Sequence, residues 1–269
     1  MITYAVVGHN EAALLANALE QALAARRSDE PVWFVDSAST DGSAELARSL
    51  DAEVVGAPLG KGRAVATAVE RCETKYMCVI DADLERTTRN VPATLREALE
   101  HTGADQVVGE FEWAAKPFRP ATSTLWDPLT GALFPEAIPT VPNVPLSGFR
   151  VFDVRLARGP LPEGFGLEVH LNIVGSLDGW RTTTADVGEY WGTVRANPGL
   201  PADIARAILD LAVARGRLTQ EARPQWDEWL DPVLKLIAEA TAEDTERRRM
   251  LMEAAARPLP PTLVGAATA

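Results

Sequence analysis

The heptapeptide MCVIDAD, residues 77–83, sets the fold class that we expect, because an apolar run leads directly into two aspartates at positions i and i+2. Met77–Ile80 is typical of a strand buried in a parallel sheet. Asp81 and Asp83 follow where such a strand ends, so both carboxylates can approach one hard cation that carries a diphosphate. The plainer interpretation is a pair of solvated or helix-capping acids, and the surrounding sequence has to distinguish the two.

Around this stretch, short β-branched runs alternate with helical patterns over the first 110 residues. This order predicts an α/β fold with a mostly parallel sheet flanked by helices. The predicted strands are Thr3–Val7, Val32–Val35, Glu53–Val55, Tyr76–Ile80 and Gln106–Gly109, and the predicted helices are Glu11–Arg26, Ser43–Leu50, Arg63–Arg71 and Val91–His101. Polar residues follow the strands, at the carboxyl edge where open α/β sheets bind ligands.

The remainder of the chain divides into two further parts, residues 111–200 and residues 201–269. The stretch from Trp113 to Pro145 contains seven prolines, which predict an irregular segment with one short helix that packs over the ligand crevice. The later predicted elements are a strand near Gly148–Asp153, a helix near Gly166–Leu177, a strand near Arg181–Val187, and helices at Ala202–Arg215 and Trp226–Ala256. The last two predict a helical C-terminal extension, with a frayed tail from Pro258.

Composition narrows the class of protein. The 269 residues carry a formal net charge of −12, which opposes a broad contact with nucleic acid or with an anionic bilayer. The sequence contains no apolar run of roughly 20 residues, so we expect no membrane span. It begins without a secretory pattern, so we expect a cytoplasmic protein. Cys72 and Cys78 are predicted to be buried free thiols.

Two further motifs lie at predicted strand ends. Asp36 is the first polar residue after its strand, where a carboxylate can accept hydrogen bonds from a base or ribose, whereas Ser39–Asp41 are helix-capping types. Gly60–Arg63 precedes a predicted helix, where backbone N–H groups and a cation can meet a diphosphate. An ordinary glycine-containing turn also explains Gly60–Arg63.

Together, these motifs resemble the GT-A glycosyltransferases of family 2 type. The stretches that carry the resemblance are Val7–Glu11, Asp36–Ser43, Leu59–Ala64 and Asp81–Leu84. Three later stretches look like the glucosyl-3-phosphoglycerate synthase and mannosylglycerate synthase group: Asp127–Glu136, Val144–Gly148 and Gly164–Val169. The resemblance implies a GT-A, Rossmann-like fold whose residues 1–110 bind the nucleotide sugar and whose residues 111–200 bind the acceptor.

The resemblance also implies an activity and its participants. It implies transfer of a hexose from a nucleoside diphosphate sugar, a UDP-sugar in preference to a GDP-sugar, to a small soluble hydroxylated acceptor. A divalent cation, Mg²⁺ or Mn²⁺, and retention at the anomeric carbon are part of this expectation. A homodimer is compatible with it.

Roles follow for individual positions. The nucleotide sugar is expected at Gly8, His9, Asn10, Glu11, Asp36, Ser37, Lys61, Asp81 and Ala82. The sugar and acceptor are expected at Ser147, Gly148, Arg150 and Glu168, with Glu168 and Asp81 at the reacting centre and Asp83 on the metal. Arg150 can supply a bidentate contact to an acceptor carboxylate or phosphate, or it can be a surface arginine. Tyr190 and Trp191 are candidates for a sugar-stacking platform or for aromatic side chains buried at a strand end.

One departure concerns the metal. In the phosphoglycerate-using enzymes, a histidine that completes the metal site follows a strand like Ala185–Gly188, but Glu189–Thr193 contains none. His170 is a candidate metal ligand, or a structural or acceptor-side group. It lies two residues beyond Glu168, a spacing that separates helical side chains by about 200°, so the two cannot easily share one metal.

Three alternatives stay open. An inverting polyprenol-phosphate-type enzyme shares the early motifs and Ser147–Arg150, although it would need a membrane-facing patch. A nucleotide-sugar-binding protein without transfer activity fits the missing histidine but not the intact Asp81, Asp83 and Lys61. A nucleotidyltransferase would carry its glycine-rich loop directly after the first strand.

Overall fold

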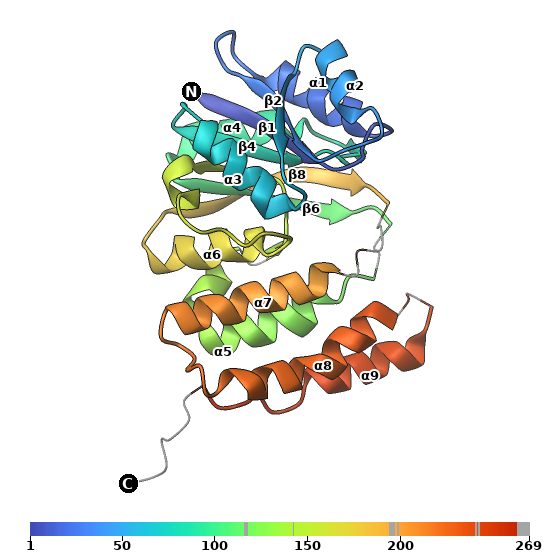
Figure 1. Cartoon of the computed structure of the whole chain (residues 1–269), viewed down its shortest axis with the longest axis vertical. Coiled ribbons are helices and arrows are strands. Elements are labelled where there is room, and N and C mark those ends of the chain that lie inside the picture. The colour runs from blue at the N-terminus through green and yellow to red at the C-terminus, as the bar shows by residue number, and fades with distance from the viewer. Residues whose placement is uncertain are drawn as a thin grey trace.

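The computed structural model describes residues 1–115, 118–141, 143–193, 197, 199–239, 241 and 243–262. One mixed sheet and the helices of the first 102 residues form the upper part of the molecule, and a layer of helices that begins at residue 122 lies below them (Figure 1). No helix in the described ranges is long and apolar enough to span a membrane.

The sheet contains eight strands in the order β3-β2-β1-β4-β7-β6-β8-β5. Their bounds are β1 (Ile2–Gly8), β2 (Val32–Ser37), β3 (Glu53–Ala57), β4 (Tyr76–Asp81), β5 (Arg86–Thr87), β6 (Gln106–Trp113), β7 (Arg150–Asp153) and β8 (Thr182–Trp191). β1 to β4 pair in parallel, β7 runs antiparallel to β4 and β6, and β8 is parallel to β6. The carboxyl ends of β1, β2, β4, β6 and β8 therefore share one edge, and β7 begins there. The predicted mostly parallel α/β fold is confirmed.

The helices are α1 (Leu15–Ala25), α2 (Ser43–Ser49), α3 (Lys61–Arg71), α4 (Val91–Thr102), α5 (Gly131–Leu133), α6 (Leu167–Leu177), α7 (Gly199–Ala214), α8 (Arg223–Glu239) and α9 (Thr245–Ala255). A π-helix, η1 (Thr122–Thr130), runs into α5, and 3-10 turns occupy η2 (Pro135–Thr140) and η3 (Val154–Ala157). The proline-rich segment is thus more helical than predicted. The predicted single helix over 226–256 is wrong, because Asp244 begins a new helix by accepting a hydrogen bond from the Arg247 N–H at 2.9 Å.

Alternating side chains of the sheet enter two cores. Val6 packs with α1 and α4 on one face, while its neighbour Val7 packs with α3 and α6 on the other. A third core lies among η1, α6, α7, α8 and α9 and includes Trp126 and Trp226. Helix α6 is common to two of these cores, since Leu171 faces the sheet and Ile173 faces the helical layer. Cys72 and Cys78 are buried free thiols, as predicted.

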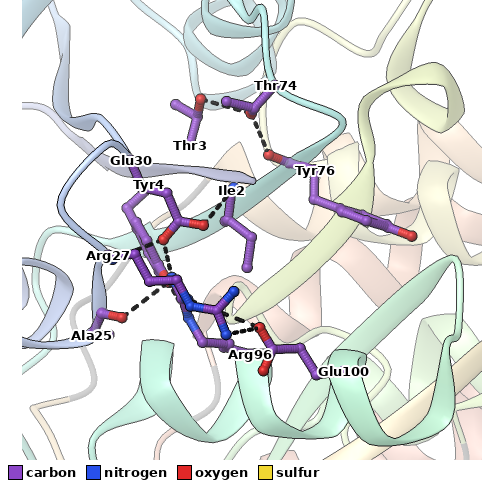
Figure 2. Close-up of polar contacts among 10 residues, drawn as sticks. All are labelled: Ile2, Thr3, Tyr4, Ala25, Arg27, Glu30, Thr74, Tyr76, Arg96 and Glu100. Atoms are coloured by element: carbon purple, nitrogen blue, oxygen red, sulfur yellow. Dashed lines mark hydrogen bonds and ion pairs between the residues drawn. The ribbon is translucent and has the colours of Figure 1, made fainter.

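A buried polar cluster fastens the beginning of β1 (Figure 2). Glu30 accepts hydrogen bonds from the N–H groups of Ile2 and Arg27, both at 2.9 Å, and it pairs with Arg96 of α4. Arg96 also donates to the Tyr4 hydroxyl. Burial raises the pKa of Glu30, but the hydrogen bonds from Arg27 and Arg96 outweigh burial and hold that pKa below its usual value. The cluster joins β1, α4 and the loop before β2.

Candidate active site

The loops after β1 and β2 border one side of the candidate site, at the carboxyl ends of the parallel strands. Asn10 has a left-handed φ of 56°, its N–H donates to Ser39 Oγ at 2.9 Å, and its Oδ1 accepts from the Thr40 N–H at 2.7 Å. His9 Nδ1 lies 2.8 Å from the Ser37 carbonyl oxygen. Because the backbone is fixed by these bonds, His9 and Asn10 are held exposed at the rim, where a nucleotide can reach them.

Gly8 marks a close approach between the ends of β1 and β4. A Cβ on Gly8 would lie 2.4 Å from Ala82 Cβ, and the Glu11 side chain folds over the same position. Ala82 is 1% exposed, and its N–H donates to the Val7 carbonyl at 2.9 Å. The Ala82 side chain therefore sets the spacing between the strands, and the expected contact of Ala82 with the nucleotide stays a prediction.

Asp36 and Ser37 are both engaged by the protein. Asp36 Oδ1 accepts from the Ser39 N–H at 2.9 Å, which closes a turn. Ser37 is buried, and its hydroxyl accepts from the Gly60 N–H at 2.9 Å and donates to the Pro58 carbonyl. Ser37 therefore anchors the turn before α3, and its buried hydroxyl does not face the nucleotide sugar as expected, whereas Asp36 stays partly exposed.

The N-terminus of α3 is covered by a loop. The N–H groups of Gly62 and Arg63 donate to the carbonyls of Gly164 and Glu163, both at 3.1 Å. A Cβ on Gly62 would lie 1.6 Å from the Pro162 carbonyl oxygen. These amides are thus occupied, contrary to the expectation that they would meet a diphosphate.

Lys61 brings two carboxylates together. Its Nζ lies 2.5 Å from Asp81 Oδ1 and 2.6 Å from Glu168 Oε1. Burial lowers the pKa of Lys61, but Asp81 and Glu168 outweigh burial and raise that pKa above its ordinary value. Lys61 is therefore charged, and it is the partner that the buried Glu168 carboxylate requires.

The loop before β7 closes against this cluster. A Cβ on Gly148 would lie 2.0 Å from Asp81 Oδ2 and 2.8 Å from Lys61 Nζ, so only glycine fits there. Ser147 is buried, with its Oγ accepting from the Phe149 N–H at 3.2 Å. Of the pair expected at the sugar, Gly148 borders the charged cluster and Ser147 supports the loop.

Arg150 is 1% exposed, although it was expected at the acceptor. It donates to the Ser147 carbonyl at 2.6 Å and to Asn172 Oδ1 at 3.2 Å. β7 is a central strand covered on both faces, so the side chain of Arg150 turns into the protein. The structure thus corrects both predicted roles, acceptor contact and surface arginine.

An aromatic wall borders the aspartates. Trp113 and Tyr190 have ring centroids 4.7 Å apart, and the Arg119 guanidinium lies 4.7 Å from the Trp113 centroid. Arg119 is within electrostatic range of Tyr190, Asp81 and Asp83. Burial, Asp83 and Asp81 raise the pKa of Tyr190. Sequence reasoning missed Trp113 and Arg119, because they lie at the start of the proline-rich segment without a recognisable motif.

Tyr190 and Trp191, the two candidates for sugar stacking, have different surroundings. Tyr190 belongs to this aromatic wall, whereas the Trp191 ring packs against the Arg86 guanidinium, 4.6 Å from its centroid. Tyr190 also lies within electrostatic range of Asp81 and Asp83.

His170 lies in a groove that does not include Asp81 or Asp83 among its lining residues. It lines a groove of about 680 Å³ bounded by the turn at Gly60, the loop at Pro162 and the α7 residues Asp203 and Arg206. Burial and the nearby Arg215 lower the pKa of His170 to about 4, so it is neutral at pH 7. This corrects its expected role as a metal ligand, because it shares the groove with Asp203 and not with Asp83.

Comparison with known protein families decides the class of this site. The sequence model of Glycosyl transferase family 2 matches residues 4–149, just over half of the chain. The chain belongs to glycosyltransferase family 2. The matched span covers all four motifs quoted for the resemblance, including Asp81–Leu84.

Solved structures similar to this family 2 glycosyltransferase confirm its GT-A fold. Glucosyl-3-phosphoglycerate synthase from Mycobacterium tuberculosis, in complex with Mn²⁺, UDP and glucosyl-3-phosphoglycerate, is 22% identical over 80% of this chain and 79% of that chain, with a TM-score of 0.68. Mannosyl-3-phosphoglycerate synthase from Rubrobacter xylanophilus is 22% identical over 82% of this chain and 76% of that chain, with a TM-score of 0.71. No curated protein matches the chain.

The family 2 site is suited to a cation that arrives with its substrate. Among the residues that the structure describes, no three His, Cys, Asp or Glu side chains come together as a metal cage. Mg²⁺ is commonly held by one or two carboxylates together with substrate phosphates. The carboxylate of Asp83, next to the Lys61-bound Asp81, fits that kind of site.

Proposed function

We propose that this glycosyltransferase transfers a hexose from a nucleoside diphosphate sugar, with a UDP-sugar favoured, to a small soluble hydroxylated acceptor. The observation that carries the proposal is the Lys61 ammonium, which holds Asp81 and Glu168 together at the carboxyl edge of the sheet. A sugar nucleotide offers that cluster a diphosphate for the cation and hydroxyl groups for the carboxylates.

The donor would lie along the rim formed by the loops after β1 and β2. His9 and Asn10 are exposed there, and Asp36 is partly exposed. UDP is bound in the complex of the similar Mycobacterium tuberculosis enzyme, which supports a uridine donor. From this rim the diphosphate would extend toward Lys61 and Asp83.

Asp83 would hold a divalent cation together with oxygens of the donor. Such a cation supplies neutralisation of the negative charge that develops on the leaving diphosphate. Mn²⁺ and Mg²⁺ are each present with UDP in crystals of the similar synthase. Lys61, which is bonded to Asp81, adds a second positive charge.

The acceptor would lie between Glu168 and the aromatic wall. Glu168 would accept a hydrogen bond from a sugar or acceptor hydroxyl, and Arg119, stacked on Trp113, would face an anionic group. The similar synthase binds phosphoglyceric acid, which supports an anionic acceptor. Retention at the anomeric carbon is part of the proposal, with attack from the face that the diphosphate leaves.

A donor and acceptor screen tests the proposed function. The purified chain is incubated with UDP-glucose, UDP-galactose or GDP-mannose, with Mg²⁺ or Mn²⁺, and with 3-phosphoglycerate, glycerate or a simple sugar. We expect nucleoside diphosphate release that an acceptor accelerates, and a product whose anomeric configuration by NMR matches the donor. A product with the opposite anomeric configuration would contradict the proposed retention. Transfer only to polyprenol phosphate would favour the inverting alternative, and binding without release would favour a binding protein.

A further inference from the structure

Arg150 makes an unusual set of contacts for an arginine of a central strand. It is 1% exposed and donates to three protein acceptors, the Ser147 carbonyl at 2.6 Å, Asn172 Oδ1 at 3.2 Å and Gln106 Oε1 at 3.4 Å. A fully buried guanidinium without a directly bonded carboxylate is costly, because a charge removed from water has to be compensated. A residue of this kind requires a reason other than stability.

The contacts of Arg150 join the loop 145–148 to α6. Asn172, which accepts from Arg150, donates in turn to the Pro145 carbonyl at 2.7 Å. Two carbonyls of the loop, those of Pro145 and Ser147, are therefore held by one connected pair of side chains. Asn172 is four residues after Glu168, so both project from the same face of α6.

The loop held in this way touches the charged cluster on its other side. Gly148 approaches Asp81 and Lys61 so closely that a methyl group would lie 2.0 Å from Asp81 Oδ2. A shift of the loop would therefore displace Asp81 directly, and a shift of α6 would displace Glu168. Arg150 therefore bonds to both parts of the protein that place these carboxylates, the loop at Ser147 and, through Asn172, helix α6.

The positive charge of Arg150 also stabilises the positions of Asp81 and Glu168. Asp81 and Glu168 lie within electrostatic range of the guanidinium, and Lys61 is the cation in direct contact with them. With Arg150 behind the loop, two cations face two carboxylates. Lys61 can then turn to an incoming diphosphate while Asp81 and Glu168 still lie in a positive field, which a low-dielectric interior strengthens.

We propose that Arg150 is a positioning residue for glycosyl transfer, which holds Gly148 against Asp81 and places Glu168 through Asn172. The inference rests on the proposed function. It assigns Arg150 no contact with donor or acceptor, so its effect should fall on turnover and not on nucleotide affinity.

Three variants test the proposal. Arg150→Met removes the charge and the hydrogen bonds, and Arg150→Lys keeps the charge with fewer bonds. Arg155→Met is the control, since the exposed Arg155 pairs with the buried Asp153 at the other end of β7 from Arg150. For each variant we would measure kcat, the donor KM, the Kd for UDP with Mn²⁺, and the melting temperature.

We expect Arg150→Met to lower kcat about 100-fold, the scale of loss that a 1 Å misplacement causes. The Kd for UDP should change less than twofold, because Arg150 bonds to none of the proposed nucleotide contacts, which are the loops after β1 and β2 for the uridine and Lys61 and Asp83 for the diphosphate. Arg150→Lys should recover about tenfold of the loss. Arg155→Met should lower the melting temperature and leave kcat within twofold.

Other outcomes contradict the inference in distinguishable ways. Wild-type kcat in folded Arg150→Met overturns the positioning role alone, as does an equal loss of kcat in the Arg155→Met control. A wild type that transfers no sugar overturns the proposed function and this inference with it. If Arg150→Met does not fold, Asn172→Leu keeps the test, because breaking the link to α6 should lower kcat about tenfold with UDP affinity retained, and unchanged kcat would refute the inference.

Discussion

At the scale of single residues, the site depends on how one ammonium group divides its contacts. Lys61 bonds to Asp81 and Glu168 at nearly equal distances, 2.5 and 2.6 Å, so neither carboxylate is left without a cation in the absence of substrate. When a diphosphate competes for Lys61, one or both carboxylates have to find other partners. In the proposed reaction those partners are hydroxyl groups of the sugar and the acceptor.

The first prediction concerns Glu168. Glu168→Gln keeps the shape of the side chain but removes the charge, so we expect kcat to fall about 100-fold or more while the Kd for UDP with Mn²⁺ stays within threefold. Steady-state kinetics and calorimetric titration check this result. Glu228→Gln, on the exposed side of α8, is the control and should keep wild-type kcat. Weakened UDP binding, or unaffected turnover, would contradict the role of Glu168.

The second prediction concerns Asp83. In the wild type, UDP with Mn²⁺ at 100-fold its Kd should add about 2.7 kcal/mol to the free energy of unfolding. Asp83→Ala should lose the part of this stabilisation that requires Mn²⁺, because its carboxylate is the proposed ligand. Thermal melts with and without Mn²⁺ measure the difference. Asp186→Ala, an exposed acid on β8, should behave as wild type, and a full Mn²⁺ effect in Asp83→Ala would exclude Asp83 as the ligand.

At the scale of elements, the turn before α3 and the loop before α6 behave as one unit. Gly62→Ala would drive a methyl group to 1.6 Å from the Pro162 carbonyl. As the third prediction, we expect a loss of about 1–3 kcal/mol in stability, typical of overpacking, with a loss of turnover because Lys61 and Glu168 follow on either side. Denaturant unfolding and kinetics test this. Gly131→Ala is the control, because no atom lies within 4 Å of the added methyl group, and it should lower neither stability nor turnover. Equal losses in the two variants would refute the steric argument.

The fourth prediction concerns the polar cluster that fastens β1 to α4. The pKa of Glu30 is lower in the folded state than in the unfolded state, so its contribution to stability is present above the unfolded value, about 4.3, and is lost as the pH falls through the folded value. Glu30→Gln should cost about 3 kcal/mol at pH 7, since the buried Arg96 keeps only the more distant Glu100, at 3.9 Å, as an acidic partner. The variant should also flatten the acid limb.

Urea unfolding between pH 3 and pH 7 measures this dependence on pH. Glu20→Gln, on the exposed face of α1, is the control and should keep the wild-type acid limb. A steep wild-type limb that persists in Glu30→Gln would show that other acids cause it.

Elements were predictable from sequence where the pattern is local. The first four strands follow apolar runs, and their predicted positions agree with the structure to within two residues at each end. The break between α8 and α9 was missed because a single cap, Asp244, decides it within a continuous helical pattern. The burial of Arg150 was missed because the sequence does not show that α6 covers the start of β7.

The candidate site was predictable as a set of residues, but not as an arrangement. Lys61, Asp81 and Glu168 were each singled out by motif, yet their mutual contact depends on how α6 lies against α3, which no local pattern encodes. Arg119 and Trp113 had no motif at all. The Glu30–Arg96 pair joins residues far apart in sequence, so it was invisible before the fold was known.

At the scale of the whole molecule, charge sets which surfaces the chain avoids. A net charge of −12 repels anionic headgroups, and the described helices include none able to span a bilayer. The fifth prediction is therefore that the chain stays in the supernatant with phosphatidylserine-containing liposomes at low salt. Neutral phosphatidylcholine vesicles are the control. Sedimentation with the anionic vesicles would strengthen the polyprenol-phosphate alternative.

Helix α6 carries a consequence for how the molecule comes apart. Leu171 packs in a core of the sheet, and Ile173 packs in the core of the helical layer. If either layer unfolded and α6 with it, the other layer would lose part of its own core. The two layers should therefore unfold in one cooperative step, despite their separate positions along the chain. Glu168 lies in the first turn of that shared helix. We therefore expect partial denaturation to produce no population that has lost its C-terminal helices and still transfers sugar.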